Sequence, residues 1–374
     1  MLLLLAFGWV DWSCASAVAK ESPPTSDELG AWGAETLLCI ERDYRVSRGQ
    51  EVYFAEEYSE RAHRRPPAFM WSSGVHLSAL AAAARFDRQQ YEDDLIARIE
   101  SLEPYWTRHE GVDGYDVLPR PTSSDRYYDD NAWIALTLLE AYHLARDAAH
   151  LKRAREIHEF LLSGMDEQLG GGIYWRENEK TSKNTCINAP AALVALRLYQ
   201  ATEKPEYFDT GLRLYEWTRT KLQDPSTGLY WDNIDLDGEI DRRQFSYNSA
   251  LMIRTALALH AITGEEVHLR EARRVAKASV ARWIVRQTGA VRDGSQFAHL
   301  LLDALLELAA VDGDRALTDV VLRSAAYVHT LRDEHGRYPR RWDQPPTAPR
   351  RRYELIHQAS AARLFFSAAI AIRE

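Results

Sequence analysis

The sequence predicts an all-α protein, folded as an (α/α)6 barrel in which six helical hairpins form a toroid. Two observations lead to this fold class. Apolar residues recur at helical spacing in about twelve segments of the 374-residue chain, and these segments alternate between amphipathic and almost wholly apolar. Because an amphipathic helix keeps one face in water and an apolar helix must be buried on most sides, the alternation requires an outer ring packed around an inner one.

The expected helices are separated by short breaks rich in Gly, Pro or Asp. The segment 265–285 is of the outer kind, because Leu269 and Ala276 lie on an apolar stripe while arginines and a lysine fill the other face. The segment 246–263 is of the inner kind, with Arg254 as its only fixed charge. In chain order, the predicted helices span residues 27–45, 68–85, 88–104, 129–146, 148–165, 187–202, 205–222, 246–263, 265–285, 296–311, 314–333 and 353–372.

Internal repeats favour a closed ring over an open solenoid. An apolar helix joins an amphipathic one in three similar segments, which recur at intervals of roughly 50 to 60 residues: LYQATEKPEYFDTGLRLYEW, LHAITGEEVHLREARRVAKA and LAAVDGDRALTDVVLRSAAY. The last helix is as apolar as the middle ones and lacks the polar outer face that caps a solenoid.

A second repeat places a set of loops on one face of the predicted barrel. Short glycine-led segments follow the amphipathic helices and precede the apolar ones: GVDGYDV, GGIYW, GLYW, TGAVRDG and HGRYPRRW. We therefore expect the aromatic residues of these loops to surround the N-termini of the inner helices, although they could instead only pack the loops onto the barrel. They are Tyr174, Trp175, Tyr230, Trp231, Tyr338 and Trp342.

Composition and motifs exclude several classes of function. The formal charge of -9 argues against nucleic acid as a partner, since such binding depends on Lys and Arg that neutralise phosphates. Cys14, Cys39 and Cys186 have neither metal-ligand spacing nor an even disulfide framework. The sequence contains no HExxH, GxSxG, P-loop or GxGxxG motif, so we expect no metal, nucleotide or other cofactor.

The N-terminus resembles a signal peptide. The opening MLLLLAFGWV is an apolar run too short to span a bilayer, and small residues follow it around Ala17. We therefore expect residues 1–19 to be a signal peptide and residues 25–374 to form a single catalytic domain, secreted or periplasmic and without a membrane span. A mis-assigned start and a buried first segment are the alternatives.

The stretch DRYYDDNAW places two carboxylates, Asp129 and Asp130, at the start of a predicted inner helix. Asp is favoured in the first helical turn, so capping is the simpler explanation for one of them. Tyr127, Tyr128 and Trp133 would enclose the pair, and burial beside a like charge raises the pKa of one carboxyl while its partner stays ionised. Adjacent carboxyls also match the roughly 5 to 5.5 Å separation of retaining glycosidases better than the inverting geometry.

Further polar and aromatic residues recur at the mouths of the inner helices. Neutral amides and hydroxyls suit sugar hydroxyls, and aromatic faces suit sugar rings, although most of the polar residues could instead cap helices. The substrate-binding residues predicted in addition to Tyr127, Tyr128 and Trp133 are Trp175, Asn184, Asn188, Asp232, Tyr247 and Asn248.

Several separated motifs resemble, in order, segments of glycoside hydrolase family 76: DRYYDDNAW, GGIYW, KNTCINAPAAL, GLYWDNI and FSYNSALMIRTALALHAITGE. The resemblance covers about residues 60–370 and implies an (α/α)6 barrel, in agreement with the hairpin count. It also implies an endo-acting α-1,6-mannanase that retains anomeric configuration and acts on a mannan-like oligo- or polysaccharide. By its DD motif, Asp129 would be the nucleophile and Asp130 the general acid and base.

Three alternatives stay open. A sugar isomerase or epimerase on the same toroid would use His299 and His357 to move a proton. An unsaturated uronyl hydrolase would need an arginine in the cavity, and the inner-helix mouths look neutral in the sequence. The chain could also bind glycans without catalysis, since a fold alone does not specify an activity.

Overall fold

The structure is a computed structural model that describes residues 22–48, 51–60, 64–121, 125–345 and 351–373. Over these residues it contains twelve α-helices, which confirms the predicted all-α barrel. The predicted signal peptide, residues 1–19, lies outside the described residues, and so does Cys14.

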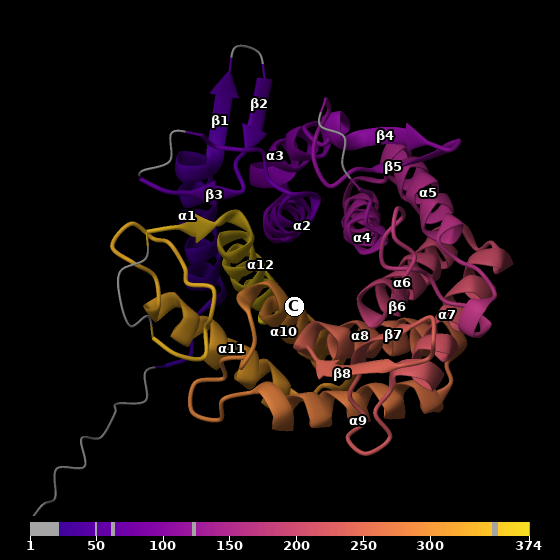
Figure 1. Ribbon diagram of the computed structural model, residues 1–374. Helices are drawn as coiled ribbons and strands as arrows, with labels where there is room; N and C mark the ends of the chain where they lie inside the picture. Colours follow the sequence, from indigo (N-terminus) through magenta and orange to yellow (C-terminus); the bar gives the residue numbers. More distant parts are fainter. Residues whose placement is uncertain (1–21, 49–50, 61–63, 122–124, 346–350, 374) are drawn as a thin grey trace, which may run out of the picture.

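Six helices form the inner ring of the barrel (Figure 1). They are α2 (Met70–Phe86), α4 (Tyr128–Ala145), α6 (Thr185–Thr202), α8 (Ser246–Thr263), α10 (Ser295–Asp312) and α12 (Leu355–Ala371). Each inner helix contacts the next one, and α12 contacts α2, so the ring is closed. Their residues are buried on nearly all sides, as helices without a polar face require.

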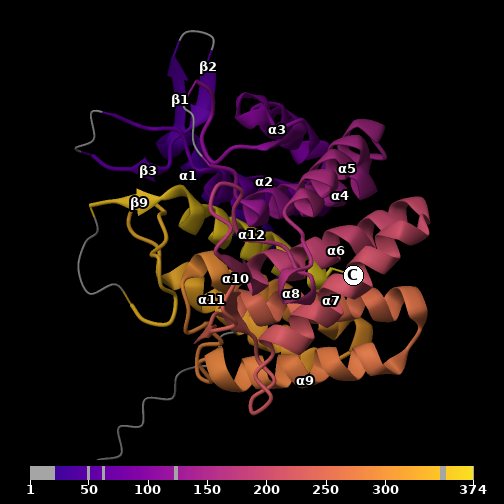
Figure 2. The same ribbon diagram turned by 45° about the vertical axis from the view of Figure 1, so that its right-hand side comes forward.

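The other six helices form the outer ring, which can be followed in Figures 1 and 2. They are α1 (Ser26–Tyr44), α3 (Arg88–Glu100), α5 (Ala148–Ser163), α7 (Pro205–Leu222), α9 (Glu266–Trp283) and α11 (Arg315–Thr330). From α3 onward, each outer helix packs against the inner helix that precedes it in the chain. Helix α1 instead packs against α12, so the first and last helices lie side by side.

Short strands and two 3-10 turns, η1 (Glu103–Tyr105) and η2 (Gln168–Gly170), occupy the connections that lead into the inner helices. All strand pairs are antiparallel, and β3 pairs with β9, which lies close to the end of the chain. A three-stranded sheet of order β6-β7-β8 covers the mouths of α6 and α8. The strands are β1 (Arg45–Arg48), β2 (Glu51–Phe54), β3 (Glu57–Tyr58), β4 (Trp106–His109), β5 (Val112–Tyr115), β6 (Ser182–Asn184), β7 (Trp231–Asp235), β8 (Ile240–Gln244) and β9 (Tyr353–Glu354).

Buried amides fasten these loops to the inner helices. The Asn131 side chain accepts a hydrogen bond from the Tyr115 backbone N–H at 2.7 Å and donates one to its carbonyl at 2.9 Å. Asn188 on α6 and Gln358 on α12 make the same paired contact with their own preceding loops. Each amide satisfies buried backbone groups that would otherwise cost free energy, and it fixes a loop at the mouth of the barrel.

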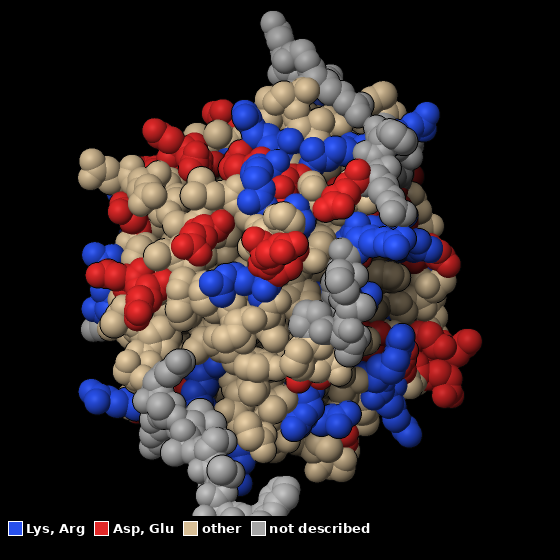
Figure 3. All heavy atoms as spheres, turned by 90° about the vertical axis from the view of Figure 1, so that its left-hand side faces the viewer, with Lys and Arg blue, Asp and Glu red and all other residues tan. Residues whose placement is uncertain are grey.

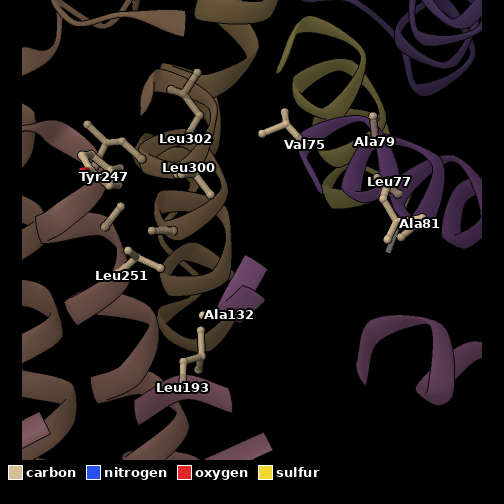
Figure 4. Packing of buried hydrophobic residues seen from close by; sticks show 14 of the residues in the cluster. Val75, Leu77, Ala79, Ala81, Ala132, Leu193, Tyr247, Leu251, Leu300 and Leu302 are labelled. Atoms are coloured by element: carbon tan, nitrogen blue, oxygen red, sulfur yellow. The ribbon is translucent and has the colours of Figure 1, made fainter. Parts of the chain in front are cut away.

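The buried core lies within and between the two rings. Figure 4 shows part of it, with Val75 on α2 and Leu300 on α10. The expectation that the loop aromatics surround the mouth is wrong for four of them, because they are buried and pack the loops onto the barrel: Tyr174, Tyr230, Tyr338 and Trp342. Trp175 is 39% exposed, and Trp231 is half-buried in β7.

The surface carries charges of both signs. On the face shown in Figure 3, acidic and basic side chains are interspersed. Within the described ranges, every helix is too short or too polar to cross a membrane.

Candidate active site

A cleft of about 630 Å³ opens at the N-terminal ends of the inner helices. Five inner helices contribute side chains from their first turns, and the β6-β7-β8 sheet forms one wall. The lining residues are Phe69, Trp71, Val117, Tyr127, Asp129, Asp130, Trp133, Trp175, Ser182, Asn184, Cys186, Asp232, Asn233, Arg243, Phe245, Tyr247 and Phe297.

Asp129 and Asp130 lie in the first turn of α4, and both line the cleft. The N-cap residue is Tyr127, so neither aspartate occupies the N-cap position that capping would predict. Asp129 Oδ2 accepts a hydrogen bond from the Trp175 indole Nε1 at 3.2 Å. Asp130 is buried, with 8% of its surface exposed. Both aspartates nevertheless lie in the first helical turn, where backbone N–H groups bond to Asp129 and the positive end of α4 favours an ionised carboxyl.

The two carboxyls differ in their affinity for protons. Burial raises the pKa of Asp129 to about 6, although the Cys186 thiol and the Trp175 indole beside it act in the opposite direction. The pKa of Asp130 is raised well above its usual value, first by burial and then by the charges of Asp129 and Glu56. Because the two carboxyls are buried side by side and repel each other when both are charged, the pair keeps a proton to higher pH than an ordinary aspartate does. Two carboxyls that share one proton can present a carboxylate and a carboxylic acid to the same ligand.

Cys186, in the first turn of α6, is the neighbour of Asp129 that motif reasoning missed. Burial and the charges of Asp129 and Asp232 raise the pKa of Cys186 well above its usual value, so the thiol stays protonated and can donate to Asp129. Tyr247 stacks on Phe297 with ring centroids 4.4 Å apart and completes this side of the cleft. A lone cysteine in an apolar helix behaves as a small hydrophobe, so no sequence pattern indicates this contact.

The structure brings six of the nine predicted substrate-binding residues to the cleft: Tyr127, Trp133, Trp175, Asn184, Asp232 and Tyr247. The other three lie outside it. Tyr128 is buried and stacks on Phe160 with ring centroids 4.7 Å apart, so the expectation that it encloses the aspartates is wrong. Asn188 is the buried amide that holds the loop before α6. Asn248 is fully buried beside Asp232, whose pKa is raised chiefly by burial while Asn248 acts in the opposite direction, so Asn248 can act on the cleft only indirectly.

Comparison with known protein families matches residues 45–371 to glycosyl hydrolase family 76. The chain belongs to this family. It is therefore a glycoside hydrolase by descent, and the family assignment inferred from the sequence motifs is confirmed. A search among curated proteins finds no match.

Several solved structures have the same fold, and two of those that follow are named as GH76 proteins. The GH76 α-mannanase BT2949 of Bacteroides thetaiotaomicron is 30% identical with a TM-score of 0.87, over 92% of this chain and 96% of that one. An inactive variant of the α-1,6-mannanase GH76A of Salegentibacter sp. HEL1_6, in complex with α-1,6-mannotriose, is 25% identical with a TM-score of 0.78, over 92% and 99%. Dfg5 of Chaetomium thermophilum, in complex with glucosamine, is 14% identical with a TM-score of 0.74, over 94% and 91%, which shows likeness of fold alone.

Several cleft residues of this family 76 chain were missed from the sequence. Phe69 falls within the predicted helix 68–85, but it is the residue before α2 and is 47% exposed at the cleft. Arg243 lines the cleft, so the expectation of neutral helix mouths is wrong: the arginine comes from strand β8. It forms ion pairs with Asp241 at 2.6 Å and with Asp232 at 3.5 Å, which compensate its charge. The other cleft residues missed are Trp71, Val117, Ser182, Cys186, Asn233, Phe245 and Phe297.

The histidines proposed for an isomerase lie away from the cleft of this family 76 protein. His299 and His357 are both buried, and neither lines the cleft. His357 Nδ1 lies 2.7 Å from the hydroxyl of Ser295, and Ser295 is fully buried. The His357 ring therefore cannot meet a sugar in the cleft. Over the described part of the chain, His, Cys, Asp and Glu residues form no group of three or more that could hold a metal ion.

Proposed function

We propose that this glycoside hydrolase is an endo-acting α-1,6-mannanase that retains anomeric configuration, with Asp129 as nucleophile and Asp130 as general acid and base. The observation that carries the proposal is that two adjacent carboxyls line one cleft, where burial raises the pKa of both and the charge of Asp129 raises that of Asp130 further. Two carboxyls in different protonation states are what double displacement at a glycosidic carbon requires.

The proposed reaction has two steps. In the first, the Asp130 carboxyl donates its proton to the glycosidic oxygen, the bond from that oxygen to the anomeric carbon breaks, and Asp129 bonds to the anomeric carbon. In the second, Asp130, now ionised, takes a proton from water as the water oxygen attacks the same carbon and the ester to Asp129 breaks. The Trp175 indole keeps Asp129 oriented during both steps, because its hydrogen bond fixes Oδ2.

Aromatic side chains in the cleft suit a neutral sugar chain. Trp175 exposes part of its indole and meets the Tyr127 ring edge to face, with centroids 5.2 Å apart. Such surfaces bind the apolar faces of sugar rings. The relatives add support: the inactive Salegentibacter α-1,6-mannanase carries asparagine in place of two consecutive aspartates and is complexed with α-1,6-mannotriose. Asp129 and Asp130 are the consecutive aspartates of this chain.

The observation that could favour a uronyl hydrolase is Arg243 in the cleft. Its guanidinium is paired with two carboxylates, so the local charge around it is not positive. An anionic sugar would therefore be repelled rather than held. We keep the neutral mannoside as the proposed substrate.

We further propose that residues 1–19 direct export, that the secreted or periplasmic enzyme is a single domain, and that it needs no cofactor. The first part is tested by measuring the mass of protein recovered from the medium or periplasm of the producing cells. A chain shortened at residue 19 is expected, and an intact chain confined to the cytoplasm would contradict it. Activity that EDTA abolishes would contradict a mechanism without a metal.

The substrate is tested by incubating the enzyme with linear α-1,6-mannan, with α-1,2 and α-1,3 mannosides, and with uronic-acid oligosaccharides. We expect products only from the α-1,6-mannan, first as intermediate lengths because an endo-acting enzyme cuts inside the chain. Free mannose as the first product would contradict endo action. Binding by calorimetry without any product would establish the glycan-binding alternative instead.

A further inference from the structure

A pocket of about 660 Å³ lies on the outside of the barrel, between the outer helices α1 and α3. The β1–β2 hairpin, which stands beside these helices in Figure 1, contributes Val52 and Phe54 to its wall. The inner helix α2 forms its floor with the buried residues His76 and Leu80. We call it the α1–α3 pocket. None of its lining residues lines the catalytic cleft, so the two sites are separate.

The wall of the α1–α3 pocket is mainly apolar and reaches the protein surface. Leu38 on α1 is 69% exposed, which is the largest exposed fraction of any large apolar side chain in the described residues. Val52 on β2 is 40% exposed, and the buried side chains of Leu37 and Leu80 continue the wall inward. Exposed apolar surface that continues into a pocket is typical of a binding site for a molecule with an apolar body.

A buried arginine without a counter-ion also lines the α1–α3 pocket. Arg98, in the last turn of α3, is 5% exposed, and its Nη1 donates to the Ser101 hydroxyl at 2.7 Å. Its Nε and Nη2 have no hydrogen-bond partner, and the nearby Glu41 pairs with Arg45 instead, at 3.7 Å. Burial lowers the pKa of Arg98 to about 10, while Tyr105 and Glu41 act in the opposite direction. A buried cation without a paired anion is costly, so a bound anion would be favourable here.

His76 is a second buried polar side chain without a partner in this pocket. It is 1% exposed, and its Nδ1 makes no hydrogen bond. Its ring meets the Phe54 ring edge to face at 4.6 Å, and the Arg98 guanidinium lies 4.9 Å from the centre of the same Phe54 ring. Burial and the charge of Arg98 lower the pKa of His76 well below its usual value, so the imidazole is neutral and can donate from Nδ1 in one tautomer. Buried polar groups are nearly always paired, so these atoms indicate a ligand.

We propose that the α1–α3 pocket binds a small monocarboxylate with an apolar body, whose carboxylate pairs with Arg98 while the body lies against Leu38 and Val52. Nε and Nη2 of an arginine form a planar fork that matches the two oxygens of a carboxylate. Nδ1 of His76 can donate to the same carboxylate. Because Arg98 is 5% exposed, its guanidinium must turn toward the pocket to meet the ligand, and side-chain rotations of this kind are common on binding.

The charges and the size of the α1–α3 pocket favour this class of ligand. Glu41 and Asp94 also line the pocket, so a doubly charged phosphate would be repelled more strongly than a singly charged carboxylate. The volume lies within the range of small-molecule sites, roughly 300 to 1,000 Å³. It admits an aliphatic or an aromatic acid, and the two share the chemistry that Arg98 and the apolar wall recognise.

Calorimetry of the full chain tests the proposal with four probes at constant ionic strength. Octanoate and 4-phenylbutyrate carry a carboxylate on an aliphatic and an aromatic body. Octanamide has the shape of octanoate without its charge, and acetate has the charge without the body. We expect saturable binding of at least one of the two larger acids, and the tighter of them identifies the body that the pocket takes. Octanamide and acetate should both bind more weakly than octanoate.

Three outcomes of this titration overturn the proposal. If neither octanoate nor 4-phenylbutyrate binds saturably, the pocket is not a carboxylate site. If octanamide binds as tightly as octanoate, the guanidinium of Arg98 has no part in binding. If acetate binds as tightly as octanoate, the apolar wall has none.

Two variants locate the site, with one control. Arg98→Gln removes the charge, and we expect at least tenfold weaker octanoate binding, on the order of 1.4 kcal/mol. Leu38→Glu covers the case in which Arg98→Gln does not fold, because Leu38 is largely exposed. It should also weaken octanoate binding, since it removes an apolar contact and adds a negative charge to the wall. Val267→Glu, an exposed apolar residue of α9 outside the pocket, should bind like the wild type. Equal octanoate affinity in Leu38→Glu and Val267→Glu, or unchanged affinity in a folded Arg98→Gln, overturns the proposal.

Discussion

Replacing Asp129 by asparagine should abolish activity and, at neutral pH, make the protein more stable. The folded protein raises the pKa of Asp129 from its ordinary value of 3.8 to about 6, chiefly by burial. A carboxyl with a raised pKa favours the folded state below its unfolded pKa, and this contribution is lost as pH rises through the folded pKa. The wild type therefore loses stability between about pH 4 and pH 7, and the neutral asparagine removes that loss.

The expected size follows from the shift. About two pKa units correspond to about 3 kcal/mol of unfolding free energy, or about 4 °C in Tm for a domain of this length. The Trp175 hydrogen bond survives in the variant, because the asparagine side-chain oxygen can still accept it. Removing the charge of Asp129 also lowers the pKa of Asp130, which acts in the same direction.

Thermal unfolding followed by circular dichroism at pH 4 to 8 checks this prediction on the wild type, Asp129→Asn and the control Asp319→Asn, an exposed residue of α11. The Tm of Asp129→Asn should exceed that of the wild type at pH 7.5, and the two should converge near pH 4. The control should follow the wild type. A difference that does not change with pH would refute the account of a buried, charged Asp129.

Three further predictions concern the cleft and its support. Asp130→Asn should lower kcat on α-1,6-mannotriose about 10² to 10⁴-fold, and far less on an aryl mannoside whose leaving group needs no proton, as steady-state kinetics will show. The acidic limb of the pH profile of kcat/KM should lie near pH 6, which is the pKa of Asp129. In Cys186→Ala this limb should move to higher pH, because the thiol lowers the pKa of Asp129 in the wild type. A limb that does not move would exclude this role of Cys186. Asn188→Ala should cost about 1 to 3 kcal/mol in denaturant unfolding, because it leaves the buried backbone groups of Ile173 unpaired, while kcat at 25 °C stays close to the wild type.

The fold could be predicted because helix ends and helix periodicity are local properties. The predicted ranges of α7 and α8, 205–222 and 246–263, match the structure. Pro205 suits the first position of a helix, and Gly264 adopts the positive φ of 71° that ends one. The alternation of apolar and amphipathic helices then determined which ring each helix joins.

The site could be predicted only in part, because an apolar helix gives no sign of which side faces the axis. Asn184 and Asn188 lie one turn apart and look alike in the sequence, yet Asn184 lines the cleft and Asn188 holds a loop. Tyr128 follows a cleft residue and points toward α5 instead. Arg243 reaches the cleft from β8, whose pairing with β7 depends on the tertiary fold. These directions depend on how the loops pack, which no local pattern specifies.

The central claim is that Asp129 attacks the sugar directly while Asp130 holds the proton. It is tested most directly by following hydrolysis of α-1,6-mannotetraose by proton NMR from the first seconds, before mutarotation mixes the anomers. The account predicts that the newly formed reducing end appears first as the α anomer, because two displacements at one carbon restore its configuration. Initial formation of the β anomer would show a single displacement by water and would contradict Asp129 as the nucleophile.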